Sequence, residues 1–233
     1  MNTIKTLLVI LCIANFNCGQ DAKSNTKFAS YSILDLEVQN GLKINSKLLS
    51  DIAKAIGKKP ENFKREVYKF DESGNEDNYV LDKGLIFKFI DEQKAHVIFE
   101  KFYKKVIEGN NYIFLTNMDF DDDYNTYYDI VIIDNSDPFK LIERIGTHGI
   151  NYDVYNHDVL RKMKEWDQDV DFVFVVVDES RIHAYMQKLP EDIQQFSSDV
   201  YDFCPDVIDQ GYGSMDVMIS DYKESKYFWL WWD

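Results

Sequence analysis

Hydrophobic residues recur along the chain in two periods, which alternate from about residue 46 to the C-terminus. A spacing of three and four residues predicts amphipathic helices, whereas strict alternation or a short apolar run predicts strands. Helical spacing covers 46–56, 95–106, 138–143, 159–166 and 193–203, and Ser214 can cap one more helix. Strand patterns cover 63–70, 85–90, 112–116, 127–133, 171–177, 182–186 and 227–232. This order contains hairpins as well as crossovers, so we expect an α+β fold with helices packed on a mixed sheet rather than a doubly wound parallel fold.

Polar segments separate these elements. Residues 71–78 (DESGNEDN) predict a turn or an exposed loop, and the acidic segment 119–125 predicts a hairpin loop. Gly57 and Gly146 stand where helices should end. The last apolar run, 227–232 (YFWLWW), is too hydrophobic for a frayed tail, and we expect it to form a strand inside the sheet.

The N-terminus has the pattern of an export signal. Lys5 precedes an apolar run at 6–16, and Asn17, Cys18 and Gly19 follow it. The run is shorter than the roughly 20 residues that a transmembrane helix needs, so a cleaved signal fits better than an anchor helix. A cysteine that closes the run and precedes a polar stretch resembles a bacterial lipoprotein lipobox, although Asn17 stands where a small residue is usual.

We therefore expect a signal peptide at 1–17, a diacylated Cys18 and a polar tether at 18–30. This places the protein on the bacterial cell envelope, lipid-anchored at the periplasmic or outer-membrane face. An ordinary secreted protein, or a cytosolic protein with an apolar N-terminal strand, is the alternative. If Cys12 leaves with the signal and Cys18 is acylated, Cys204 remains as a single cysteine, and no internal disulfide forms.

Composition and charge narrow the function classes. The 45% of hydrophobic residues is enough for a core and excludes a disordered acidic tail. Without the leader, 25 basic and 41 acidic side chains give a net charge of −16. Phosphate-backbone affinity comes from clustered Lys and Arg, so nucleic acid is not an expected partner.

Four short motifs resemble a known family. They are GTHGINYD at 146–153, EWD at 165–167, FCPDVIDQG at 203–211 and LWWD at 230–233. Their order is similar to that of a bacterial family known as domain of unknown function 4253, and residues 84–145 resemble the N-terminal part of its longer members. The resemblance implies an α+β domain and brings no established activity or catalytic residues. This chain departs from the family at Tyr212, where a small or hydroxyl residue is typical, and in its leader, which many members lack.

On this basis we expect an N-terminal α+β region at 31–145 and the family domain at 146–233, as one folding unit or two. Two polar clusters in the family domain are candidate sites. In the segment CPDVIDQG, Asp206 and Asp209 could act as an acid/base or cation-binding pair, with Cys204 as a nucleophile if His148 lies near it. The structural alternative is a helix stop followed by a hydrogen-bonded turn, with Cys204 a buried thiol. Candidate binding residues are Thr147, Asn151, Tyr152, Asp153, Trp166 and Gln210.

The sequence lacks the common motifs of catalytic and metal-binding sites. The acidic loop at 119–125 lacks the glycine and the glutamate that a calcium loop needs, and the four histidines lack zinc spacing. No phosphate-binding glycine loop or serine-hydrolase elbow occurs, and we expect no cofactor and no metal. The favoured interpretation is a non-catalytic acidic module for a basic protein partner, of which neutralisation of a basic toxin, as by an immunity protein, is one version. The alternative is a hydrolytic enzyme that uses the Cys204 loop.

Overall fold

The computed structural model describes residues 42–70, 75–81 and 83–233, all of which fall within one compact unit. The predicted signal peptide, Cys18 and the tether lie outside the described residues. Within the described part of the chain, no helix is long and apolar enough to cross a membrane.

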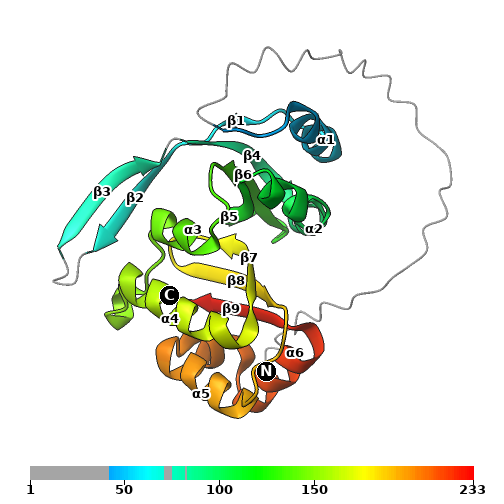
Figure 1. Ribbon diagram of the computed structural model, residues 1–233. Helices are drawn as coiled ribbons and strands as arrows, with labels where there is room; N and C mark the ends of the chain where they lie inside the picture. The colour runs from blue at the N-terminus through cyan, green and yellow to red at the C-terminus, as the bar shows by residue number, and fades with distance from the viewer. Residues whose placement is uncertain (1–41, 71–74, 82) are drawn as a thin grey trace, which may run out of the picture. The chain divides into compact units, whose positions relative to one another are not determined.

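A seven-stranded mixed sheet forms the centre of the fold (Figure 1). Its strands, in spatial order, are β1 (Glu61–Asn62), β4 (Gly84–Asp91), β6 (Thr126–Ile133), β5 (Tyr112–Phe120), β7 (Phe172–Val177), β8 (Arg181–Met186) and β9 (Tyr227–Trp231). Every neighbouring pair is antiparallel except β5 and β7, which are parallel. The predicted α+β class is therefore confirmed, and so is the prediction that the aromatic C-terminal run is a strand of the sheet.

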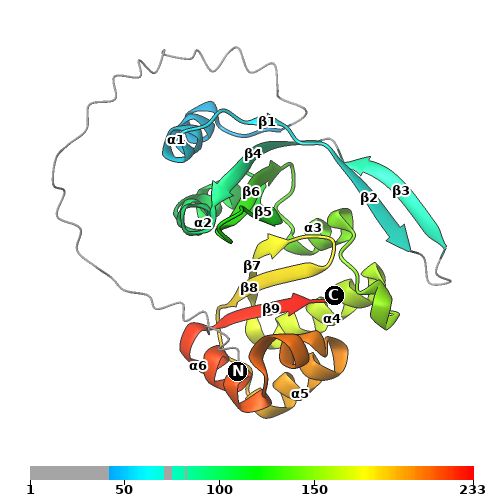
Figure 2. The ribbon, with the colours of Figure 1, turned by 180° about the vertical axis from the view of Figure 1, so that it is seen from behind.

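Helices cover both faces of the sheet because both faces of its central strands are apolar. Along β5, Ile113 and Leu115 belong to one core and Tyr112 and Phe114 to the other, as expected where successive side chains point to opposite faces. The helices α1 (Ser46–Ile56) and α2 (Glu92–Glu108) close the first core. The second core is closed by α3 (Pro138–Ile145), α4 (Asn156–Val170), α5 (Ile193–Phe203) and α6 (Met215–Ser225). Seen from behind, β8 and β9 lie in front of α4 (Figure 2).

A separate hairpin, β2 (Arg65–Phe70) with β3 (Glu76–Leu81), extends from the body of the fold (Figure 1). Its base is fixed by an ion pair of 2.7 Å between Arg65 and Asp178, which follows β7, and by the buried side chain of Leu81. The prediction of a turn or loop through residue 78 was wrong, because β3 already begins at Glu76.

Several boundaries differ from the predicted ones for local reasons. Helix α1 is capped by Asn45, since its side chain accepts hydrogen bonds from the backbone N–H groups of Lys47 and Leu48. Strand β5 continues to Phe120, so the acidic hairpin loop shortens to 121–125. Most of the segment CPDVIDQG forms a π-helical stretch, η3 (Val207–Tyr212), rather than a simple turn.

Candidate functional site

The two polar clusters predicted from the sequence meet at Asp206. The hydroxyl of Tyr152, at the end of the short 3₁₀ helix η2 (Ile150–Tyr152), donates to Asp206 Oδ1 at 2.5 Å. Gln210 Nε2 donates to the same oxygen at 2.8 Å, and the backbone N–H of Asp233 donates to Oδ2 at 3.0 Å. Asn151 Nδ2 completes the group by donating to the backbone oxygen of Asp233 at 2.6 Å. The carboxylate therefore joins both clusters to the C-terminal residue.

Asp206 is ionised in this setting although it is only 2% exposed. Burial by itself would raise the pKa of its carboxyl, but hydrogen bonds from Tyr152, Asp233 and Gln210 stabilise the carboxylate and hold the pKa below its ordinary value. The same bond raises the pKa of Tyr152 to about 12. A carboxylate that accepts three hydrogen bonds from within the protein stabilises the local structure. To act as a general base, Asp206 would first have to lose one of these bonds.

Cys204 precedes Asp206 by two residues, but its thiol is buried and protonated, which is not the state of a nucleophile. Its side chain is fully buried, and Sγ donates to the backbone oxygen of Trp231 at 3.1 Å. Burial raises the pKa of the thiol to about 12, whereas a reactive cysteine needs a pKa below the ordinary value. His148, the predicted partner, contacts Glu179. Its backbone N–H donates to the backbone oxygen of Glu179 at 2.8 Å, and its Nε2 lies 3.7 Å from the Glu179 carboxylate.

The remaining candidates of the two clusters make other contacts. Thr147 is buried and donates to the backbone oxygen of Asp178, Asp153 ends η2 in the left-handed conformation, and exposed Asp209 accepts from Tyr201. Gly149 lies so close to the Trp232 ring that any side chain there would overlap it. These contacts are made within the protein, and the roles assigned to these residues from sequence stay predictions.

Trp166, the remaining candidate, lies in a groove of about 320 Å³ between α4 and α5. Its ring is 4% exposed and packs edge to face on Phe196, with the ring centroids 5.7 Å apart. The groove is lined by five carboxylates, together with Pro190 and Gln195; the acidic residues are Glu165, Asp169, Glu191, Asp192 and Asp199. We call this feature the acidic groove.

One of the protein's own cations lies at the acidic groove. The ammonium group of Lys162 is 3.1 Å from Asp199 Oδ2 and 3.3 Å from Glu165 Oε1, and it lies 5.4 Å from the centre of the Trp166 ring. The indole N–H of Trp166 donates to the same Asp199 oxygen at 3.3 Å. Five carboxylates and one ammonium group leave a local charge of −4. The arrangement can hold further cations by ion pairing with the carboxylates that Lys162 does not contact.

Sequence reasoning found Trp166 but not the acidic side chains around it. Glu165 and Asp169 are four residues apart on α4, while Asp192 and Asp199 come from α5 and its cap. The first pair could have been read from helical spacing, but the proximity of the two helices could not. In the part of the chain that the structure describes, no group of three or more His, Cys, Asp or Glu side chains could hold a metal ion.

Comparisons with known proteins locate one family. The searches of curated proteins and of solved structures gave no match. Residues 129–233 match the model of the family described as "Domain of unknown function (DUF4253)", a region that begins within β6 and contains the Asp206 junction and the acidic groove. The resemblance inferred from the four motifs to the DUF4253 family is thereby confirmed for the C-terminal part of this chain, from Asp129 to Asp233.

Proposed function

We propose that the protein is an envelope lipoprotein whose DUF4253 domain binds a basic protein partner through the acidic groove. The observation that carries the proposal is the contact of Lys162 with Glu165, Asp199 and the Trp166 ring, because it is an internal example of the ligand that the groove would take. A lysine or arginine of a partner would meet the carboxylates that Lys162 does not contact, namely Asp169, Glu191 and Asp192.

The charge distribution agrees with such a role. Residues 129–233 hold 9 basic and 22 acidic side chains, which gives them a net charge of −13. The net charge of the whole chain is −15. A strongly charged surface accelerates encounters with oppositely charged partners, and the effect falls with ionic strength. The Asp206 junction supports the proposal indirectly, since its polar groups are used to fasten the C-terminus and its thiol is protonated.

Binding to an arginine-rich peptide, with a peptide of the same length rich in glutamate as a negative probe, tests the proposal by calorimetry at low salt. The informative variant is Asp169→Asn/Glu191→Gln, because both side chains are exposed and line the groove. The matched control, Asp122→Asn/Asp123→Asn, removes the same charge from the exposed β5–β6 loop. Since exposed ion pairs contribute up to about 1 kcal/mol each, we expect a roughly tenfold weaker affinity for the groove variant.

Equal affinities of the two variants would refute the groove as the binding site, and absence of peptide binding by the wild type would refute the proposed function. A partner isolated from native envelopes at low salt should show the same order of affinities.

The anchor has its own test. Mass spectrometry of the full-length chain produced in a bacterium should find an N-terminus at an acylated Cys18, and the Cys18→Ala variant should keep its leader. A wild-type product with an intact leader or a free thiol at Cys18 would remove the lipid anchor from the proposal and leave the groove untouched.

A further inference from the structure

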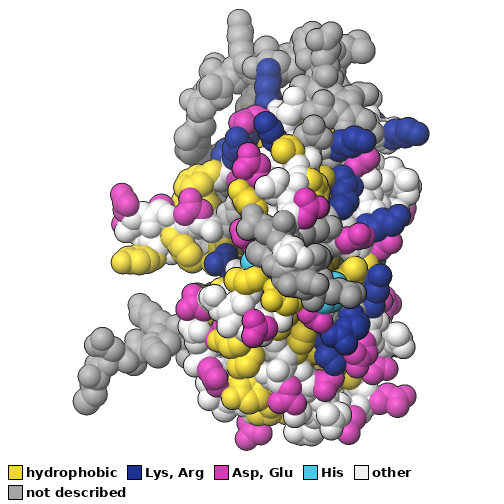
Figure 3. Space-filling view, turned by 90° about the vertical axis from the view of Figure 1, so that its left-hand side faces the viewer, with side chains coloured by type: hydrophobic (Ala, Val, Ile, Leu, Met, Phe, Trp, Pro, Cys, Tyr) yellow, Lys and Arg dark blue, Asp and Glu magenta, His cyan; other side chains and the backbone are white. Residues whose placement is uncertain are grey.

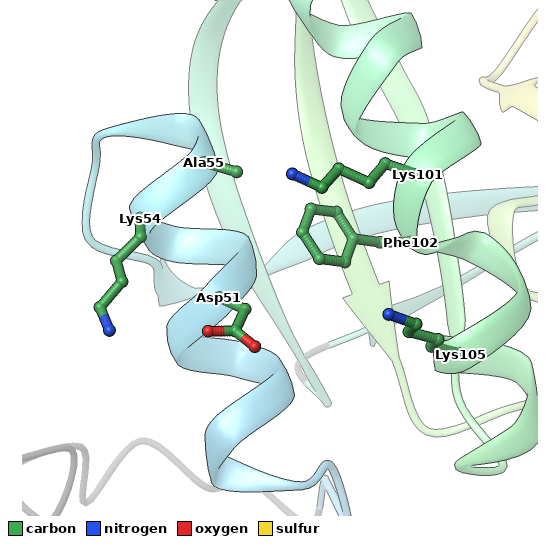
Figure 4. Close-up of a pocket in the computed structure, with 6 residues that line it drawn as sticks. All are labelled: Asp51, Lys54, Ala55, Lys101, Phe102 and Lys105. Atoms are coloured by element: carbon green, nitrogen blue, oxygen red, sulfur yellow. The ribbon is translucent and has the colours of Figure 1, made fainter.

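A second hollow, of about 430 Å³, lies between α1 and α2 on the opposite side of the sheet from α4 and α5. Three lysines line it, Lys54 from α1 and Lys101 and Lys105 from α2, with Phe102 and Ala55 as apolar lining and Asp51 as the single carboxylate. In Figure 4, Lys101 and Lys105 extend from α2 toward α1 on either side of the Phe102 ring, whereas Lys54 points away from α2. The three lysines and the one aspartate among the lining residues sum to a formal charge of +2. We call this feature the lysine hollow.

The lysines of the hollow have no acidic partner within 4.0 Å among the described residues, whereas some other cations do. Lys88, for example, pairs with Glu61 at 2.8 Å, and Lys162 pairs with two carboxylates. Lys94 donates to the backbone oxygen of Ile56 and so helps to end α1. The lysine hollow thus holds positive charge that the described fold does not neutralise, in a chain whose net charge is −15.

Positive charge is also concentrated in the sequence around α1. Residues 42–61 contain five lysines and two acidic residues, for a net charge of +3, against −13 for residues 129–233. On the face shown in Figure 3, most Lys and Arg side chains lie in the upper half and along the right side, Asp and Glu are spread over the whole face, and the lowest part carries Asp and Glu alone among the charged groups. The upper part of the view corresponds to the side of α1, and the lower part to the side of α5 (Figure 1).

We propose that the lysine hollow binds the phosphate group of anionic membrane lipids, so that the domain rests on the membrane through α1 and α2. The lipid as source of the phosphate rests on the proposed anchor: among the described helices α1 lies nearest in sequence to the predicted tether, so the anchor would bring this face, rather than the acidic groove, next to the bilayer. An anionic surface attracts the lysine hollow and repels the acidic domain, which leaves the groove open to a partner.

Vesicle binding of the chain from Gly19 to Asp233 tests the proposal without an acyl chain, since this chain keeps every described residue. The probes are vesicles of phosphatidylcholine alone and of equimolar phosphatidylcholine and phosphatidylglycerol, used in a flotation assay at low salt. Wild type should float only with the anionic vesicles. A lysine near an anionic surface contributes about fivefold in affinity, so Lys101→Gln/Lys105→Gln should bind about 25-fold more weakly.

The matched control is Lys223→Gln/Lys226→Gln, which removes two charges from exposed positions at the end of α6. Equal binding of the two double variants, or equal flotation of wild type with both vesicle types, would overturn the proposal. Saturable binding of inorganic phosphate at the hollow without flotation would overturn the assignment to lipid. Failure of acylation at Cys18 or of peptide binding at the acidic groove is measured separately and does not alter these outcomes.

Discussion

Replacement of Asp206 by alanine should destabilise the fold more than any comparable change at an exposed acidic residue. The carboxylate is 2% exposed and accepts hydrogen bonds from Tyr152, Gln210 and the backbone of Asp233. Hydrogen bonds to a charged group contribute about 1.5–3 kcal/mol each, so three of them set an upper range of about 5–9 kcal/mol. Because Tyr152 is 40% exposed and Gln210 is exposed, both donors can bond to water in the variant. We therefore expect a loss of about 3 kcal/mol in the free energy of unfolding.

Urea denaturation followed by circular dichroism at neutral pH measures this loss. With a slope of about 2 kcal/mol per molar urea, the midpoint should fall by about 1.5 M. The control is Asp209→Ala in the same segment, whose carboxylate is exposed and accepts one bond from Tyr201 at 3.2 Å; its cost should stay within about 0.5 kcal/mol. Similar midpoints for the two variants would refute the view that Asp206 fastens the C-terminus.

The contribution of Asp206 should also depend on pH, with a defined sign. The pKa of its carboxyl is lowered from 3.8 in the folded state, so the folded state binds this proton less readily than the unfolded state. The stabilisation is therefore complete above the unfolded-state pKa and is lost as the pH falls through the folded-state value. The difference in midpoint between wild type and Asp206→Ala should shrink in that acidic range, and a difference that grows on acidification would contradict the assignment.

Two further predictions concern the surroundings of the junction. In the chain from Gly19 to Asp233, Cys204 is the single cysteine. Iodoacetamide should modify it slowly at pH 7 and rapidly in denaturant, because burial in the folded state raises the pKa of the thiol to about 12. Rapid modification of the native protein would contradict this and support a catalytic role for Cys204. Gly149→Ala should lower the free energy of unfolding by about 2 kcal/mol, since the new methyl group overlaps the buried Trp232 ring; a wild-type urea midpoint would show that the ring can move aside at little cost.

Hydrophobic periodicity was sufficient to predict the layers of this fold but not all of its elements. Apolar positions spaced for one buried face predict α2 and α5, and the aromatic run predicts β9. Strand β3 was missed because its first residues, Glu76 to Asn78, are polar and belong to a hairpin with few buried positions. A strand whose first half is polar leaves too little alternation to detect.

The candidate site shows where local reasoning ends. The motif residues Tyr152 and Asp206 are 54 positions apart, and their contact depends on how η2 and η3 lie against the end of β9. Similarly, Asp199 contacts Lys162 because α4 and α5 pack through Trp166 and Phe196. Spacing within a helix predicts which side chains share a face, but tertiary packing decides which faces meet.

The indole N–H signal of Trp166 gives the most direct test of the acidic groove. This group donates to Asp199 inside the groove, and its NMR signal can be distinguished from those of the other three tryptophans by its loss in Trp166→Phe. The account predicts that an arginine-rich peptide shifts the Trp166 signal in a saturable way and leaves those of Trp229, Trp231 and Trp232 in place. An unmoved Trp166 signal under conditions in which the peptide is bound would contradict the account.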